Sequence, residues 1–300
     1  MITMHNLEWY RVFYWAAKLG SLTLAARQLN ITQPAVSHTL KHLEEAQGTN
    51  LFVRTTKGVT LTSDGEVLYP FVEQALQFIE SGERTIADRQ GLLTGEIRIG
   101  ASDTLSKHYL LPYLEQFHQQ YPGIRIRMIN RTTPETLALL KEGAIDFGVV
   151  HLPAEDPRVH VRKAARQQDI LVGGQKYKAL ADQPLSLRQI AQFPLLLLEQ
   201  GVSTRASLDA YARSQDMIFH PEFELGSVDL LVRFAQSGFG LTFVVRDYVR
   251  EELASGALVE IPLDPPVPER HIGIATLDSM PLPVAARQLV DMMEGQAETE

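Results

Sequence analysis

The sequence contains no cysteine, which excludes disulfide bonds and thiolate metal sites. It also lacks a long apolar run: the longest candidate, residues 193–198, is far shorter than the ~20 residues of a membrane-spanning helix. Residues 1–20 mix charged and aromatic side chains instead of placing an apolar core behind a basic end, so we expect no signal peptide. These absences together favour a protein of the reducing cytoplasm.

Common catalytic motifs are missing as well. The chain has no GxSxG nucleophile elbow, no phosphate loop ending in GK[ST], no GxGxxG and no HExxH. His38 and His42 stand four residues apart, a spacing that can place two metal ligands on one helix face, but a third ligand is lacking nearby. We therefore predict that the protein is not an enzyme and needs no metal or cofactor.

The 300 residues are 45% hydrophobic, which suits a globular chain of two or three domains. The net charge of −8 is divided unevenly. Residues 1–61 hold six Lys/Arg against three Asp/Glu, whereas residues 62–90 hold two against six and residues 91–300 hold twenty against twenty-seven. The basic excess at the amino-terminal end favours a local phosphate-facing surface on an otherwise acidic protein.

Residues 21–43 carry the pattern around which the chain is organised. Apolar residues follow the 3, 4 and 7 spacing of a one-sided helix at Leu22, Ala25, Ala26 and Leu29. Ser21 can cap this helix, and Asn30 tolerates the left-handed backbone of a tight turn. Thr32 or Gln33 then opens a second helix, in whose first turn Pro34 is acceptable. The pattern predicts a helix-turn-helix.

The second helix has one apolar and one polar face. Val36, Leu40 and Leu43 make the buried face, and the residues opposite or beside it are Gln33, Pro34, Ser37, His38, Lys41 and Glu45. Gln can address adenine, Ser can reach either base type, and Lys can meet guanine or phosphate in a major groove. A solvated helix in an ordinary bundle would show the same periodicity, so the pattern alone leaves both interpretations open.

The segment SLTLAARQLNITQPAVSHTLKHLE, followed by LFVRTTKGVTLTSDGE, resembles the amino-terminal domain of LysR-type bacterial transcriptional regulators. The matching positions are Ser21, Ala25, Ala26, Leu29, Gln33, Pro34, Ala35, Val36, Ser37, Leu43, Glu44, Leu51, Phe52, Arg54, Leu61, Thr62 and Gly65. The match covers roughly the first 66 residues, and the remainder agrees in layout more than in motif. One departure is AQGTN at residues 46–50, where the family more often has an aliphatic residue before the glycine.

Two further elements complete the expected DNA-binding domain. Residues 7–19 form a first helix that ends at Gly20, with Leu7, Val12, Phe13, Ala16 and Leu19 available for a core. Its aromatic residues favour packing over stacking on nucleic acid. Residues 51–54 and 59–62 form a hairpin wing, on which Arg54 either contacts phosphate or pairs with a carboxylate. The predicted DNA-binding residues are Thr32, Gln33, Pro34, Ser37, His38, Lys41, Arg54 and Lys57.

Residues 63–90 have the spacing of one long helix with an apolar seam. The seam residues are Leu68, Val72, Ala75, Ile79 and Ile86, at steps typical of a coiled coil. In the resembled family this linker helix pairs two subunits. We therefore expect a homodimer, and a homotetramer as a dimer of dimers, because two recognition helices one helical turn apart read a dyad-symmetric site.

Strands and helices alternate after residue 92. Expected strands are 96–100, 124–130, 146–150, 170–173, 194–198, 222–225, 241–245, 258–262 and 271–276, with helices at 107–121, 134–142 and 283–294. This alternation predicts parallel sheets covered by helices. The resemblance implies a two-lobed effector domain shaped like a periplasmic solute-binding protein. The expected domains are a winged helix-turn-helix (1–62), a linker helix (63–91) and an effector-binding domain (92–300). Its first lobe spans about 92–164 and 266–300, and its second about 165–265.

Polar residues follow several of the expected strands, where ligands bind in such sheets. The candidate effector residues are Ser102, Thr104, Thr132, Thr133, Gly201, Val202, Ser203, Thr204, Ser227 and Val228. Each hydroxyl alone is better explained as a helix cap, but the group indicates a small-molecule pocket. Asp103 and Arg205 favour opposite ligand charges, and of these alternatives we prefer a small carboxylate.

The sequence thus predicts a regulator that binds promoter DNA under the control of a small effector, without contact with a membrane. Two other functions agree less well with the sequence. A solute-binding protein for transport would need an export signal and no basic amino-terminal domain. An enzyme fused to a helix-turn-helix would need a nucleophile or cofactor motif in residues 91–300, and none of the motifs above occurs there.

Overall fold

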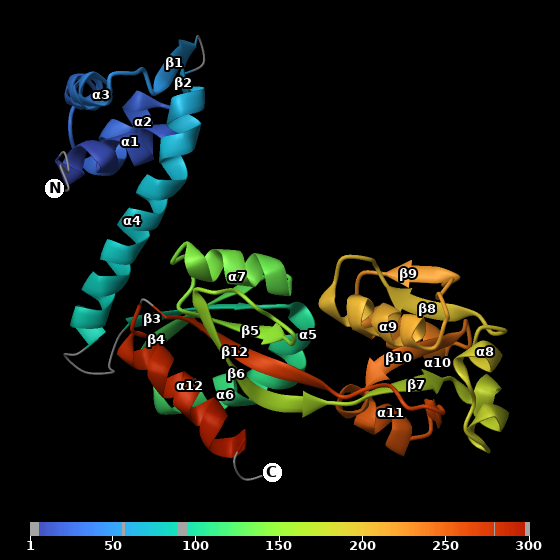
Figure 1. The fold of residues 1–300 in the computed structure, drawn as a ribbon. Helices are drawn as coiled ribbons and strands as arrows, with labels where there is room; N and C mark the ends of the chain where they lie inside the picture. Colours follow the sequence, from blue (N-terminus) through green and yellow to red (C-terminus); the bar gives the residue numbers. More distant parts are fainter. Residues whose placement is uncertain (1–5, 56–57, 89–94, 279, 298–300) are drawn as a thin grey trace. The chain divides into compact units, whose positions relative to one another are not determined.

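The computed structural model describes residues 6–55, 58–88, 95–278 and 280–297, which form two compact units, residues 1–86 and residues 87–300 (Figure 1). The first unit contains the predicted helix-turn-helix. Its helices are α1 (Leu7–Leu19), α2 (Leu22–Leu29) and α3 (Gln33–Gln47). They pack on one another in all three pairs.

Local capping sets the ends of these helices as predicted. Gly20 ends α1 with a left-handed backbone, φ +60°. The Ser21 hydroxyl accepts a hydrogen bond from the Leu24 amide and opens α2. Asn30 ends α2 in the left-handed conformation, φ +56°, and Thr32 caps α3. The turn between the two helices is therefore fixed by its own residues.

The core of the first unit consists of one apolar face from each helix. Phe13, Ala25, Val36 and Leu43 are fully buried there, and Trp9 and Trp15 are packed against them. The aromatic residues of α1 thus serve packing, as expected. The sequence interpretation was wrong for Leu7 and Leu19, which lie at the two ends of α1, beyond the described core, and stay exposed.

The wing is a two-stranded antiparallel hairpin, β1 (Phe52–Thr55) and β2 (Gly58–Leu61). Helix α4 (Ser63–Asp88) follows it and is the longest helix in the structure; the predicted end at Gln90 lies outside the described residues. Leu68 and Val72 of the predicted seam pack into the core of the first unit instead of facing away from it. No helix in the described part of the chain is both long and apolar enough to cross a membrane.

The second unit contains two five-stranded sheets, which confirms the predicted two-lobed α/β architecture (Figure 1). The first sheet has the order β4-β3-β5-β12-β6. Its strands are β3 (Gly95–Ala101), β4 (Ile124–Asn130), β5 (Phe147–His151), β6 (Val159–Gln167) and β12 (Arg270–Leu277). Strands β3, β4 and β5 are parallel as predicted, whereas β12 runs antiparallel to both β5 and β6.

Helices cover both faces of this sheet. Ile97 and Ile99 of β3 face a core shared with α6 (Leu111–Gln120) and α12 (Val284–Ala297). The alternate residues Gly100 and Gly148 face α7 (Thr133–Lys141), where an added Cβ would lie 2.9 Å and 2.5 Å from the Thr136 methyl carbon. Glycine at these two positions lets α7 approach the sheet closely.

The second sheet has the order β11-β7-β10-β8-β9. Its strands are β7 (Asp169–Gly173), β8 (Leu195–Leu198), β9 (Phe223–Leu225), β10 (Leu241–Val245) and β11 (Val259–Ile261). Strands β8, β9 and β10 are parallel, and β7 is antiparallel to its two neighbours. The covering elements include α8 (Leu187–Ile190), α9 (Ser203–Ser214), α10 (Val228–Gln236), α11 (Arg250–Ala254) and the 3₁₀ helices η2 (Gln175–Ala181) and η3 (Arg246–Val249).

Two features of the first lobe were not predicted. Strand β6 was missed because seven of its nine residues are less than fully buried, so it lacks an apolar pattern. Since β6 belongs to the first sheet and β7 to the second, the chain crosses between the sheets at Gln168 and not at the predicted lobe boundary near Ala164. The helix expected at 107–121 begins earlier as α5 (Asp103–Leu105) and passes through a π-helical turn, η1 (Ser106–Leu110), before α6. Such turns are frequent at functional sites.

Gly65 provides a test of packing in the first unit. A Cβ at this position would lie 2.3 Å from the carbonyl oxygen of Leu51, a backbone atom that cannot rotate away. We expect Gly65→Ala to lower the stability of this unit by about 1–3 kcal/mol. Trp9 and Trp15 are the only tryptophans in the sequence, so urea unfolding followed by tryptophan fluorescence at fixed protein concentration reports on this unit alone.

Gly82→Ala is the matched control. Nothing lies within 4 Å of a Cβ built at Gly82 in α4, so the same substitution is expected to leave the fluorescence midpoint unchanged or to raise it. Equal midpoints for Gly65→Ala and the unchanged protein would show that the wing and α4 do not pack as described.

Candidate DNA interface and effector cleft

The outer face of α3 is polar and accessible. Gln33, Pro34, His38 and Lys41 are exposed, and Ser37 is half-buried beside them. The Gln33 amide donates a hydrogen bond to the Ser37 hydroxyl at 3.0 Å, and Lys41 lies 3.6 Å from Glu45 on its solvent-exposed side. These contacts are weak and exchangeable, so the side chains can turn to meet an approaching base edge or phosphate.

The wing lies beside this face. A groove of about 320 Å³ runs between α3 and the hairpin, and Ser37, His38, Lys41 and Arg54 line it. Arg54 is exposed, and Lys57 lies outside the described residues. The hydroxyl of the remaining predicted residue, Thr32, accepts a hydrogen bond from the Ala35 amide.

Glu44 fixes the wing against α3 and was not predicted as a site residue. Its carboxylate accepts hydrogen bonds from the backbone amides of Leu51 and Phe52, at 2.8 Å and 3.1 Å. The residue therefore holds the first wing strand at a set distance from the recognition face. Glu44 appears among the matching positions of the family segment, which is the only signal in the sequence that marks it.

His38 and His42 contact each other on α3. Their rings meet edge to face with centroids 4.2 Å apart, and His42 also stacks on Trp9. Within the described ranges, no three His, Asp or Glu side chains gather around a common point.

The predicted effector residues have several different surroundings. Ser102 and Thr132 cap α5 and α7. Thr104, Ser227 and Val228 line one cavity of about 480 Å³, whereas Gly201 lines another beside Arg205. Val202 and Ser203 lie at the first turn of α9. That all of these residues contribute to a single pocket stays a prediction.

Thr133 and Thr204 are connected through two residues that the sequence reading missed. The Thr133 hydroxyl accepts a hydrogen bond from the His151 amide at 3.2 Å. The Arg270 guanidinium touches both the His151 ring, at 3.4 Å from Nδ1, and the Thr204 hydroxyl, at 3.3 Å. His151 belongs to the first lobe and Thr204 to the second. The side chain of Arg270 therefore connects the two lobes, at a point between the predicted effector residues Thr133 and Thr204.

Arg270 is itself held by Asp169. Its Nε and Nη2 donate to the two carboxylate oxygens of Asp169 at 2.5 Å and 2.9 Å. Both side chains are almost fully buried, and they lie at the two points where the chain passes between the sheets. A buried charge needs such a partner because transfer out of water is costly. No local pattern marks either residue, since each stands at the start of a strand next to polar sequence.

His151 is neutral in this setting. Burial, and then the positive charge of Arg270, lower the pKa of His151 to about 4. The neighbouring Gln167 side chain donates to the Tyr248 hydroxyl in the second lobe. Polar contacts thus continue from His151 across the junction.

A second set of contacts bridges the lobes at η1. The Lys107 ammonium lies 2.7 Å from the Asp229 carboxylate on α10. His108 stacks on Tyr248 with ring centroids 4.0 Å apart, and burial lowers the pKa of His108. The unpredicted π-turn therefore presents two neighbouring side chains to the second lobe.

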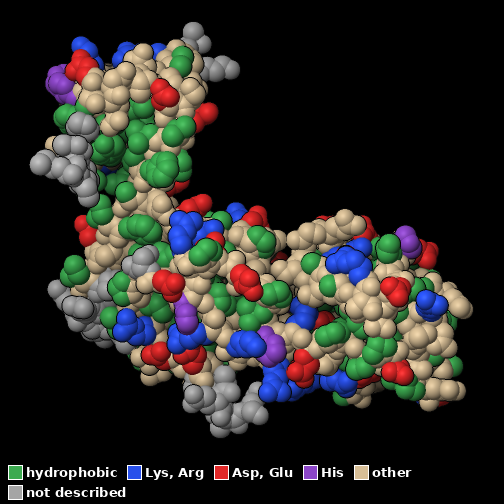
Figure 2. All heavy atoms as spheres, viewed as in Figure 1, with side chains coloured by type: hydrophobic (Ala, Val, Ile, Leu, Met, Phe, Trp, Pro, Cys, Tyr) green, Lys and Arg blue, Asp and Glu red, His purple; other side chains and the backbone are tan. Residues whose placement is uncertain are grey.

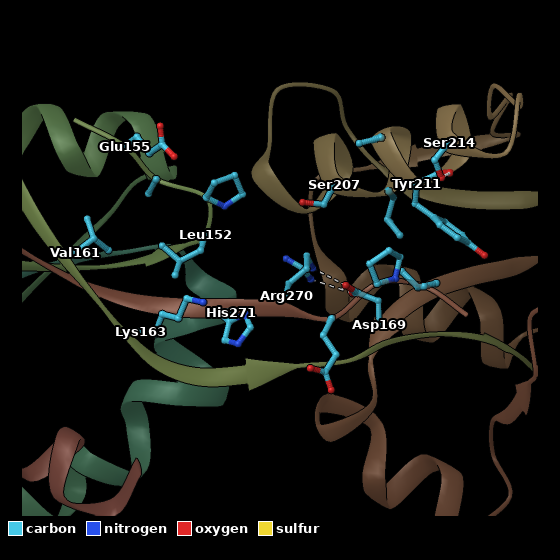
Figure 3. A pocket seen from close by; sticks show the side chains of 17 residues that line it. Leu152, Glu155, Val161, Lys163, Asp169, Ser207, Tyr211, Ser214, Arg270 and His271 are labelled. Atoms are coloured by element: carbon cyan, nitrogen blue, oxygen red, sulfur yellow. Dashed lines mark hydrogen bonds and ion pairs between the residues drawn. The ribbon is translucent and has the colours of Figure 1, made fainter. Parts of the chain in front are cut away.

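The Arg270–Asp169 pair borders a cavity of about 660 Å³ between the lobes (Figure 3). Figure 3 shows Leu152, Val161 and Lys163 on the side of the first lobe and Ser207, Tyr211 and Ser214 on the side of the second, with Arg270 between them. The cavity is within the size range of small-molecule sites and combines apolar walls with a few charged groups.

Comparisons with known proteins agree with this architecture. Residues 7–66 match the family described as "Bacterial regulatory helix-turn-helix protein, lysR family", and residues 90–298 match "LysR substrate binding domain". The chain belongs to the LysR family. The predicted resemblance is thereby confirmed, and this LysR-family chain is a DNA-binding transcription regulator with an effector-binding domain.

Individual relatives extend over nearly the whole LysR-family chain. The HTH-type transcriptional activator CmpR of Synechocystis sp. is 25% identical over 291 residues, which are 97% of this chain and 94% of CmpR. A full-length OxyR variant from Pseudomonas aeruginosa has a TM-score of 0.72 at 23% identity, covering 97% of this chain and 95% of that one. A peroxide-bound OxyR mutant from Corynebacterium glutamicum has a TM-score of 0.60 at 25% identity, covering 100% and 94%.

The buried His151 makes stability depend on pH. Because the pKa of His151 in the folded protein lies below the ordinary 6.5, at pH values between the two pKa values this histidine is protonated in the unfolded chain and neutral in the folded chain. The contribution of neutral His151 to the free energy of unfolding is therefore fully present above pH 6.5 and is lost as the pH falls toward 4. We expect the effector-binding unit to lose about 2 kcal/mol between pH 7.5 and pH 5 from this group.

Urea unfolding followed by circular dichroism measures this loss. His151→Gln should remove about 2 kcal/mol of the pH dependence, whereas His220→Gln, at an exposed position, should retain it. An identical pH dependence in His151→Gln and the unchanged protein would contradict a neutral, buried His151.

Proposed function

We propose that this LysR-family regulator reads a DNA major groove with the outer face of α3 and responds to a small carboxylate held at Arg270. The observation that carries the DNA part is the continuous polar face of Gln33, Ser37, His38 and Lys41 beside the wing groove. A helix of this kind fits the width of a major groove, and its amide, hydroxyl and ammonium groups match base-edge donors and acceptors.

The remaining contacts in this proposal go to phosphate. Thr32 at the start of α3 and Arg54 and Lys57 on the wing would bind the DNA backbone and fix the register of the helix. Glu44 supports this geometry indirectly, because it holds the wing strand beside α3.

Dimerisation through α4 is the second part of the proposal. The exposed face of α4 carries an apolar stripe at Val67, Phe71, Ala75, Ile79 and Ile86, with spacings of four, four, four and seven. Val67, Phe71 and Ile86 are each about two-thirds exposed, at 66%, 68% and 67%. Such a stripe on a long helix favours pairing with a second copy. A pair of dimers would give the predicted homotetramer.

The effector part rests on the unequal use of the Arg270 donors. Nε and Nη2 are committed to Asp169, whereas Nη1 makes, among the described residues, two longer contacts, to His151 and Thr204. A ligand carboxylate in the adjacent cavity can replace those two contacts with a charge-assisted hydrogen bond. Because Arg270 contacts both lobes, such a ligand would change the interlobe angle and thereby the spacing of the DNA-binding domains.

We propose further that the ligand is bound without being turned over, and that the protein acts in the bacterial cytoplasm, where promoter DNA lies. The chemistry around Arg270 supports binding only: the neighbouring groups are a neutral imidazole, a hydroxyl and a paired carboxylate, with no activated nucleophile among them.

The DNA contact can be measured with a duplex that the protein selects from a randomised library. We expect Lys41→Ala to weaken binding to this duplex by about 1–3 kcal/mol if Lys41 meets a base edge. If Lys41 contacts a phosphate, the plot of the logarithm of the association constant against the logarithm of the salt concentration should become less steep by about 0.9. Fluorescence anisotropy titrations at several salt concentrations give both quantities.

Lys178→Ala is the control, since this exposed lysine lies in the effector-binding unit. An unchanged affinity together with an unchanged salt slope in Lys41→Ala would remove Lys41 from the interface.

The effector can be sought by calorimetry with a panel of small carboxylates and their uncharged amides. The test variant is Asp169→Asn/Arg270→Gln, because it neutralises both members of the buried pair and leaves no unpaired charge. We expect a carboxylate that binds the unchanged protein to lose at least tenfold in affinity, about 1.4 kcal/mol. Lys178→Gln should bind as the unchanged protein does. If no carboxylate gives a binding signal, or if a carboxylate binds the double variant as tightly as the unchanged protein, the proposed contact with Arg270 is excluded.

A further inference from the structure

A separate cavity of about 920 Å³ lies at the junction of the two lobes. The first lobe contributes residues of η1 and β6 to its lining, and the second contributes Val245, Asp247 and Tyr248. Arg270 and Asp169 do not line this cavity, so it differs from the candidate effector site described above, although the two share Lys163 and His271.

A β-bulge arranges the cationic side of this cavity. The register between β6 and β12 shifts at Ile272 and Gly273, which leaves Ala164 without a direct partner. In a regular strand, Lys163 and Arg166 would point to opposite faces because they are three residues apart. The extra residue reverses the alternation between them, and both side chains line the same cavity with His271, the cross-strand partner of Arg166.

These cations have little local negative charge. Among the described residues, neither Lys163 nor Arg166 has an acidic side chain within ion-pair distance, whereas their neighbour Arg162 pairs with Glu294 at 2.9 Å. Asp247 is the one acidic residue of the described cavity lining, and it already accepts two hydrogen bonds from Arg250. Figure 2 shows Lys/Arg and His side chains gathered over β6.

The other side of the cavity is aromatic. Tyr109 and Tyr113 have ring centroids 5.4 Å apart, and Tyr248 stacks with His108. The π-turn η1 supplies His108 and Tyr109. Aromatic rings beside unpaired cations are suited to a ligand that has both a flat ring and an acid group.

We propose that this cavity is a second small-molecule site that binds an aromatic anion, with Lys163 and Arg166 on the acid group and Tyr113 against the ring. Its volume is in the range of sites for metabolites of this kind. The site does not depend on the proposed effector contact at Arg270. A ligand bound in this cavity would hold the two lobes in one relative arrangement, because both lobes contribute residues to its lining.

Calorimetry of the full-length protein with three probes tests the proposal. Phenyl phosphate carries ring and charge, inorganic phosphate carries charge alone, and phenol carries the ring alone. We expect phenyl phosphate to bind at least tenfold more tightly than either. Arg166→Met should weaken phenyl phosphate at least tenfold, and Tyr113→Leu should remove most of its advantage over inorganic phosphate.

Two controls place the binding. Arg162→Met alters a cation of the same strand that does not line the cavity, and Ser207→Ala alters the cavity beside Arg270; both should bind phenyl phosphate within twofold of the unchanged protein. The proposal is overturned if phenyl phosphate fails to bind at millimolar concentration, if Arg166→Met binds it normally, or if Ser207→Ala alone loses it. Circular dichroism confirms that each variant is folded.

Discussion

The buried ion pair between Arg270 and Asp169 is the interaction on which the two-lobed unit depends. The pair occupies the only two places in the described chain where the backbone passes between the sheets, and each sheet contributes one member. Removing one partner would leave an uncompensated buried charge, which costs about 3–5 kcal/mol. The backbone connects the lobes at two crossings. A polar junction connects them as well, and it also includes His151, Thr204, Gln167 and Tyr248.

A polar junction has different properties from an apolar one. Apolar burial is non-directional, whereas hydrogen bonds require particular donor and acceptor positions. In the proposed effector site, Arg270 would exchange its contacts with Thr204 and His151 for a ligand oxygen while keeping Asp169. The proposed exchange would give the unit two states between which a small ligand selects. In the DNA-binding unit, by contrast, the wing is fixed to α3 by Glu44, so that unit is built to keep one shape.

The sequence predicted local features well and long-range polar contacts poorly. Ser21, Asn30 and Thr32 determine helix ends through their own backbone and side chains, so their roles could be derived from a few neighbouring residues. Strand β6 was missed because it is a polar edge strand, and Leu68 and Val72 were assigned to a dimer seam although the first unit uses them in its core. Arg270 and Asp169 are 101 residues apart, and only the fold shows that they meet. The placement of Glu44 could be recognised only through its family segment.

Strand β6 has a further consequence for how the protein behaves at high concentration. It is the longest strand, it lies at the edge of its sheet, and its outer backbone edge has no neighbouring strand in the described structure. An open edge of this length invites a strand from another copy. Arg162, Lys163 and Arg166 place like charges along it, and its bulge interrupts the regular ladder. The side chains that make β6 hard to recognise in the sequence are thus of the kind that keeps an edge strand from pairing with another copy.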